Sequence, residues 1–144
     1  MTTIVANRER MVADSKITME RIVGNDTSYT ASKIWILKNA IIGTAGCSGD
    51  GEKFVAWFKK KRRPTLTLEK GFEALVLTPE GVYHVDEDCS MAQIQGDWYA
   101  IGSGSAAALG ALHAGVTLEE AVEIACKVDT YTGLPIQVAK LPRA

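Results

Sequence analysis

Histidine and closely spaced cysteine pairs are scarce or missing in this sequence. There are two histidines, His84 and His113, and three scattered cysteines, Cys47, Cys89 and Cys126. No CxxC, HExxH or paired Cys/His spacing occurs, which argues against a dedicated zinc site. An odd set of widely spaced cysteines is typical of reduced thiols in a cytosolic protein. We therefore expect chemistry that depends on neither histidine nor a metal, and no cofactor.

Long apolar runs and an excess of charge of one sign are missing as well. No run approaches the roughly 18 apolar residues that span a bilayer, and the N-terminus lacks a basic-then-apolar signal. The 16 Lys and Arg residues nearly balance 17 Asp and Glu, for a formal net charge of -1. This balance indicates no global attraction to nucleic acid or an anionic membrane. With 144 residues, 47% of them hydrophobic, we expect one soluble, cytoplasmic domain over residues 1–144.

Apolar runs separated by turn residues alternate with helical spacing along the chain. Eight short runs are typical of strands, at residues 2–6, 11–14, 33–37, 40–44, 74–77, 82–85, 98–101 and 136–141. Helical spacing predicts a helix over 49–61 with Ser48 as its N-cap. Two more helices are expected, after Ser105 and after the N-cap Thr117, and a turn at 24–26. This order predicts an α+β fold with mainly antiparallel sheets and helices on their outer faces.

Thr2 is the first residue along the chain that could act as a catalytic group. Initiator methionine is often removed before a small residue such as Thr, and removal would leave Thr2 with a free α-amine beside its hydroxyl. An α-amine has an ordinary pKa of about 7.7 to 8.0, so it can accept a proton near neutrality. One residue would then supply both a nucleophile and a general base without histidine.

Asp14 and Lys33 lie at the ends of predicted strands and could tune such a nucleophile. An Asp at one strand end and a Lys at the start of another can form a partly buried ion pair. An ammonium beside a hydroxyl favours its deprotonated form. Spacing alone favours an ordinary surface Asp and Lys over an ion pair, so this pairing stays open at this point.

Two glycine-containing segments precede predicted helices. In the segment 43–46 the glycines allow a substrate backbone to approach closely, and a free N–H can donate to an oxyanion. The segment 102–105, Gly-Ser-Gly-Ser, is a weak imitation of a phosphate loop. It lacks the GxxxxGK[ST] pattern, which argues against nucleotide binding.

Together and in this order, these segments resemble the proteasome β-subunit family, including its bacterial relative, the HslV peptidase. The segment 2–6 is similar to the family's mature N-terminus with its nucleophilic threonine, and 12–18 is similar to the strand that carries its acidic residue. The segments 32–34, 43–46 and 100–105 are similar to those with the lysine, the cleft-lining backbone and the serine-bearing loop. The last match, 128–133, is to the aspartate and hydroxyl pair that orient the threonine amine.

The resemblance implies a set of site residues. The catalytic residues it implies are Thr2, Asp14, Lys33, Ser103, Asp129 and Thr132. Substrate contacts are implied for Thr18, Thr44 and Ala45, and Gly46 is implied as the oxyanion donor. Only removal of Met1 would be needed to expose Thr2, because the sequence shows no propeptide.

The resemblance also implies a fold, partners and an activity. The fold is the four-layer αββα sandwich of the N-terminal-nucleophile hydrolases, with one helix between Gly46 and Ala100 where the family has two. The activity is threonine-type endopeptidase hydrolysis of a polypeptide through an acyl-enzyme on Thr2. A homo-oligomeric ring is implied, with a partner ATPase unfoldase as a candidate. Two alternatives stay open, an amidase of the same fold that acts on a small-molecule amide, and a catalytically silent scaffold subunit.

Overall fold

The computed structural model describes residues 2–22, 25–46 and 48–142. Met1, Gly24 and Cys47, which entered the sequence predictions, lie outside the described residues, and so does the side chain of the expected N-cap Ser48. Within the described ranges, no helix is long and apolar enough to cross a bilayer. Cys89 and Cys126 are free thiols.

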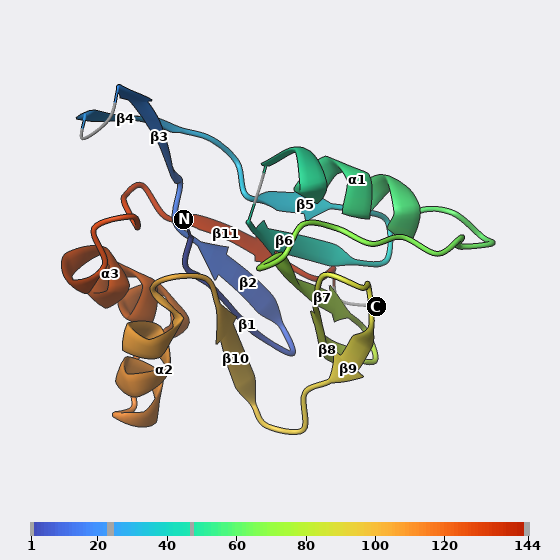
Figure 1. The fold of residues 1–144 in the computed structure, drawn as a ribbon. Coiled ribbons are helices and arrows are strands. Elements are labelled where there is room, and N and C mark those ends of the chain that lie inside the picture. Colours follow the sequence, from blue (N-terminus) through green and yellow to red (C-terminus); the bar gives the residue numbers. More distant parts are fainter. Residues whose placement is uncertain (1, 23–24, 47, 143–144) are drawn as a thin grey trace.

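Two antiparallel sheets form the centre of the molecule (Figure 1). The four-stranded sheet has the order β10-β1-β2-β11. Its strands are β1 (Ile4–Asn7), β2 (Arg10–Ala13), β10 (Trp98–Ile101) and β11 (Gln137–Lys140). The five-stranded sheet has the order β5-β6-β7-β8-β9. Its strands are β5 (Ile34–Ile36), β6 (Ile41–Ala45), β7 (Glu73–Thr78), β8 (Gly81–Val85) and β9 (Met91–Gln93).

A separate hairpin, β3 (Lys16–Ile22) with β4 (Asn25–Thr30), projects beyond these sheets (Figure 1). The predicted turn at 24–26 was wrong for Asn25 and Asp26, which belong to β4 and pair with Ile22 and Glu20. Their side-chain types favour turns, but cross-strand pairing decides the conformation here. The sequence also did not predict β9, a three-residue strand whose side chains are all exposed.

The central part of the inner strands is buried on both faces, which is why runs such as residues 4–6 of β1 and 74–77 of β7 are apolar at every position. In β1, Ile4 and Ala6 face the other sheet, whereas Val5 packs against helices. The same alternation in β7 turns Leu75 and Leu77 toward the other sheet. The edge strand β5 differs, because Ile36 is 70% exposed although the apolar run 33–37 indicates a strand covered on both sides.

Three apolar clusters hold the elements in succession. One lies between the two sheets, a second between the five-stranded sheet and helix α1 (Ser48–Phe58), and a third between the four-stranded sheet and helices α2 (Ser105–His113) and α3 (Leu118–Val128). Figure 1 shows α1 over β5 and β6, with α2 and α3 beside β10 and β1. The predicted capping box of Thr117 and Glu120 begins α3.

The predicted helix over 49–61 ends early, because α1 stops at Phe58. The chain then folds back, so that Nη2 of Arg63 donates to the carbonyl of Phe58 at 2.9 Å and its guanidinium lies 4.5 Å from the centre of the Phe58 ring. Arg63 thus satisfies a terminal carbonyl that a longer helix would have paired internally. Residues 59–72 form no second helix, as the departure from the resembled family indicates.

Candidate active site

The two central sheets bring the ends of three strands together around Thr2. Thr2 precedes β1, Asp14 follows β2, and Lys33 precedes β5 of the other sheet. The β1–β2 pairing continues past the strands, because the N–H of Asp14 donates to the carbonyl of Thr3 at 3.0 Å. In return the N–H of Thr3 donates to Oδ1 of Asp14 at 3.0 Å. The antiparallel register therefore places the Asp14 carboxylate beside the start of the chain.

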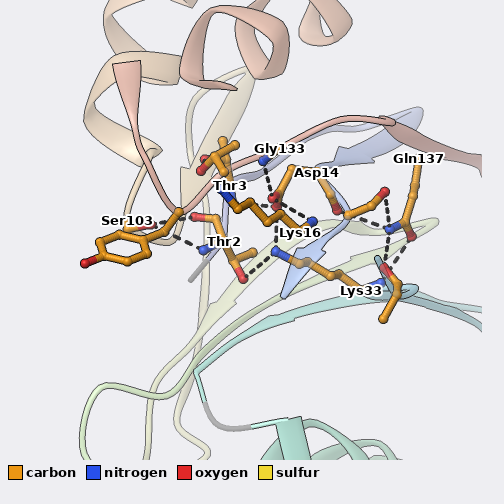
Figure 2. Close-up of polar contacts among 12 residues, drawn as sticks. Thr2, Thr3, Asp14, Lys16, Lys33, Ser103, Gly133 and Gln137 are labelled. Carbon is orange, nitrogen blue, oxygen red and sulfur yellow. Dashed lines mark hydrogen bonds and ion pairs between the residues drawn. The ribbon is translucent and has the colours of Figure 1, made fainter. Parts of the chain in front are cut away.

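Lys33 connects the carboxylate to the Thr2 hydroxyl (Figure 2). Its Nζ lies 2.8 Å from Oδ1 of Asp14 and 3.1 Å from Oγ1 of Thr2. The side chains of Lys33 and Asp14 are 3% and 0% exposed. Burial lowers the pKa of Lys33, and the hydrogen bond and charge of Asp14 oppose this shift only in part. A buried ammonium with a lowered pKa stabilises a nearby alkoxide and exchanges protons more readily than a surface lysine does.

The Asp14 carboxylate is held by backbone donors as well as by Lys33. Oδ2 accepts from the N–H of Gly133 at 3.0 Å and from the N–H of Lys16 at 3.2 Å. With the N–H of Thr3 on Oδ1, both oxygens are satisfied. These donors compensate the cost of burying the charge and fix its orientation.

A second polar chain reaches the backbone nitrogen of Thr2 from the opposite side. The N–H of Thr2 donates to Oγ of Ser103 at 3.3 Å, and that hydroxyl donates to Oδ2 of Asp129 at 2.5 Å. Oγ1 of Thr132 donates to the same oxygen at 2.6 Å and lies 2.8 Å from Oγ1 of Thr3. Burial alone would raise the pKa of Asp129, but the hydrogen bonds from Ser103, Thr132 and the N–H of Tyr131 outweigh it and lower the pKa.

The glycines of the Gly-Ser-Gly-Ser loop serve close packing against the N-terminal strand. Gly102 has a φ of 95°, and a Cβ there would lie 1.9 Å from the carbonyl oxygen of Thr2. A Cβ on Gly104 would lie 1.9 Å from Oγ1 of Thr3. The loop can therefore bring Ser103 to the Thr2 nitrogen only because both neighbours lack a side chain.

Two cavities flank Thr2, and both are lined by Thr2 and Gly46. The first, of about 350 Å³, is also lined by Ala45, Gly71, Glu73, Gly102 and Ser103. The second, of about 280 Å³, is lined by Lys33, Thr44 and Glu52 together with Ile17, Tyr29, Ala31, Ser32 and Trp35. Gly46 has a φ of 127°, which favours glycine. The expected contacts Thr44, Ala45 and Gly46 thus lie at the walls of these cavities.

Thr18 is the one expected site residue that lies away from Thr2. It lines a separate small cavity with Lys16, Thr27 and Tyr131 and neither of the two cavities beside Thr2. Its Oγ1 is buried without a hydrogen-bond partner among the described residues. The structure brings Thr2, Asp14, Lys33, Ser103, Asp129 and Thr132 into one connected network of hydrogen bonds.

Two residues beside the site, Gln137 and Glu73, were not predicted from the sequence. Gln137 of β11 donates through Nε2 to the carbonyl of Asp14 at 3.1 Å and accepts the N–H of Lys33 at 3.1 Å through Oε1. It thereby ties the last strand to both halves of the ion pair. Glu73 lines the first cavity and contacts His84. A lone Gln or Glu in a strand carries no local signal, so only the fold reveals these positions.

Within the described ranges, no group of three or more His, Cys, Asp or Glu residues is placed so that it could hold a metal ion. Neither a protein-family model nor a curated protein matches the sequence. Solved structures do match. Thiobacillus denitrificans BPH is 20% identical with a TM-score of 0.71, covering 97% of this chain and 96% of that one. Its complex with Epoxomicin is 19% identical with a TM-score of 0.70, covering 97% of both chains.

The eukaryotic HslV from Trypanosoma brucei is also similar, with 20% identity and a TM-score of 0.71, and the match covers 98% of this chain and 99% of that one. The chain therefore has an N-terminal-nucleophile hydrolase fold with mixed helix and strand content. More narrowly, the fold is that of HslV-type and proteasome-type peptidases, which confirms the sequence resemblance at the level of the fold.

Proposed function

We propose that this chain is an N-terminal threonine peptidase that forms an acyl-enzyme on Thr2 once Met1 is removed. The observation that carries the proposal is the position of Lys33 Nζ, 3.1 Å from Oγ1 of Thr2. Thr2 lines two cavities that can receive the two sides of a scissile bond. Among the described residues, no other side chain with a hydroxyl both contacts a buried lysine ammonium and lines these two cavities.

The reaction begins with attack of Thr2 Oγ1 on the carbonyl carbon of the substrate. The hydroxyl proton passes to the α-amine of Thr2, directly or through one water, and the carbonyl oxygen becomes an oxyanion that the N–H of Gly46 stabilises. Collapse of this intermediate breaks the C–N bond, and the leaving nitrogen takes the proton from the α-ammonium. Water then hydrolyses the Thr2 ester with the same amine as base, which releases the acid and restores Thr2.

The surrounding residues divide into two supports. Lys33, held by Asp14, stabilises the developing negative charge on Oγ1. Ser103, with Asp129 and Thr132 behind it, holds the Thr2 nitrogen at the distance observed for the backbone N–H, 3.3 Å. Thr44 and Ala45 line the cavities beside Thr2 and would contact the substrate there. Thr18 would contact a substrate that extends to the separate cavity that it lines.

The remaining proposals concern domain and assembly. The succession of α1, two sheets and the α2–α3 pair supports a four-layer αββα sandwich formed by one domain over residues 1–144. The likeness to HslV supports a polypeptide substrate, a homo-oligomeric ring and an ATPase partner. Light scattering at micromolar concentration should give a mass of at least six subunits. A monomer would contradict the ring and favour an amidase acting on a small molecule.

Intact-mass spectrometry with epoxomicin tests the catalytic proposal. An epoxyketone has two electrophilic carbons, so a residue with both a hydroxyl and a free amine can react with it twice. We expect a chain without Met1 that gains one epoxomicin, located on Thr2 by peptide sequencing. Thr2→Ala should gain none. A processed chain that neither reacts nor cleaves unfolded protein would contradict the proposal and favour a silent subunit.

A further inference from the structure

The two cavities beside Thr2 differ in which hydrogen-bond partner of that residue lines them. Ser103, which accepts the hydrogen bond of the Thr2 nitrogen, lines the first cavity. Lys33, which contacts the Thr2 hydroxyl, lines the second cavity. The hydrogen-bond partner of the Thr2 nitrogen and the partner of its hydroxyl thus line different cavities, and Gly46 lines both.

If Thr2 acts as proposed above, this difference determines which half of the substrate lies in which cavity. The leaving nitrogen of the substrate receives its proton from the Thr2 amine, so it must lie on the side of that amine. Because Ser103, the partner of the Thr2 nitrogen, lines the first cavity, this is the cavity on the side of the amine. The acyl half of the substrate, which stays bonded to Oγ1, then extends into the second cavity beside Lys33.

Among the described residues that line the first cavity, Glu73 is the only charged one. It begins β7, and its carboxylate is anchored on both oxygens. Oε1 lies 3.1 Å from Nε2 of His84, and Oε2 accepts the N–H of Gly102 at 3.4 Å. The His84 ring is itself held edge-on against Tyr99. The Glu73 side chain is 37% exposed, so it remains open to a ligand in the cavity.

Most other residues that line this cavity are small and have no polar side chain that could compete with Glu73 for a ligand. Gly71, Gly102 and Gly46 have no side chains, and Ala45 has only a methyl group. A long cationic side chain can therefore enter and reach the carboxylate with its apolar stem against these walls. Each oxygen of Glu73 keeps a second lone pair for such a cation.

We propose that the first cavity binds the leaving-group side of the substrate, and that Glu73 selects Lys or Arg as the residue that follows the cleaved bond. An exposed or half-exposed ion pair of this kind changes affinity by up to about fivefold. The preference should therefore be clear but not absolute.

Digestion of a reduced and alkylated casein, followed by sequencing of the products, measures this preference whichever residues the acyl side selects. Lys and Arg should occur at new N-termini about three- to fivefold more often than their frequency in casein predicts. Glu73→Gln keeps an oxygen for the Gly102 N–H and should remove the enrichment. The exposed Glu80→Gln in the β7–β8 turn and Glu52→Gln in the second cavity should both retain it. Retained enrichment in Glu73→Gln, or no enrichment in the wild type, would overturn the inference while leaving the peptidase proposal intact.

A binding measurement keeps the inference testable if no cleavage occurs. Lysinamide and norleucinamide share an α-amine and differ mainly in the ε-ammonium, so they imitate the two leaving groups. In Thr2→Ala, NMR titration should shift the Gly71, Glu73 and Gly102 amide signals with lysinamide binding about three- to fivefold more tightly than norleucinamide. Adding Glu73→Gln should make the two equal. Equal binding in the parent, or shifts confined to the second cavity, would overturn the inference even if the protein is an active peptidase.

Discussion

The ammonium nitrogen of Lys33 lies 3.1 Å from the hydroxyl oxygen of Thr2, although the two residues are 31 positions apart in the chain. Thr2 leads into the four-stranded sheet and Lys33 into the five-stranded sheet. Their contact therefore depends on how closely the sheets pack. A Cβ on Gly43 of β6 would lie 2.8 Å from Sδ of Met11 and 2.9 Å from Cγ2 of Ile4, so a glycine at this position is needed for that approach.

Replacing Lys33 should affect turnover and stability separately. Lys33→Arg keeps the charge but places a larger planar head in a buried space fitted to an ammonium, so kcat should fall by about a hundredfold or more. Lys33→Ala leaves the buried Asp14 without its cation and should lower the free energy of unfolding by about 3 kcal/mol. Urea unfolding and peptide hydrolysis measure the two effects.

The matched control for Lys33→Ala is Lys53→Ala. Lys53 is 68% exposed and lies 3.7 Å from Asp50, so its loss should change the free energy of unfolding by less than about 0.5 kcal/mol. Wild-type turnover in Lys33→Arg would show that the ammonium does not support the hydroxyl.

Thr2 variants test whether nucleophile and base belong to one residue. Thr2→Ala should abolish hydrolysis with little change in melting temperature, and Thr2→Ser should keep partial activity because it retains hydroxyl and amine. An uncleavable extension before Thr2 should abolish activity although every side chain remains. Full activity of an extended protein, with its mass verified, would exclude the N-terminal nucleophile.

Two glycines near α2 should respond to alanine in opposite directions. Gly104→Ala would force a Cβ to 1.9 Å from Oγ1 of Thr3 and 3.0 Å from Oγ1 of Thr132, so it should lower the free energy of unfolding by about 1 to 3 kcal/mol. Gly110 lies inside α2, and an added Cβ would meet no atom within 4 Å beyond its chain neighbours and the nearby backbone of its own helix. Gly110→Ala should raise the free energy of unfolding by about 0.5 to 1 kcal/mol. Thermal melting of both variants checks the pair, and equal responses would contradict the close approach at Gly104.

Asp129 should make stability depend on pH in the acidic range. Burial would raise its pKa, but the hydrogen bonds from Ser103, Thr132 and Tyr131 together outweigh burial and lower the pKa in the folded state. The ionised carboxylate therefore stabilises the folded protein fully above the unfolded value of about 3.9, and this stabilisation is lost as pH falls through the folded pKa. Asp129→Asn should be less stable than the wild type at pH 7, with the difference in melting temperature shrinking below about pH 4. A difference that stays constant from pH 2 to pH 7 would assign the effect to packing.

Local sequence patterns predicted the elements whose residues show a regular apolar pattern or a capping motif. The paired strands 74–77 and 82–85 were predicted from apolar runs around a turn, and they form the centre of β7 and β8. The capping box at Thr117 was predicted from two side chains three residues apart. In contrast β4, with the sequence NDTSYT, has no apolar alternation, and only its partner β3 makes it a strand.

The sequence by itself determined the order of the three helices and of eight strands, without β3, β4 and β9, and through its resemblance to a known family it determined the candidate site residues. It could not decide which of them meet. Lys33 reaches Thr2 because two sheets pack face to face, whereas Thr18, four positions after Asp14, lies in a different cavity on the projecting hairpin. Glu73 lines the same cavity as Thr2 only because β7 packs near the loop that carries Ser103. Contacts across sheets depend on register and on the distance between layers, and neither quantity is encoded in a short stretch of sequence.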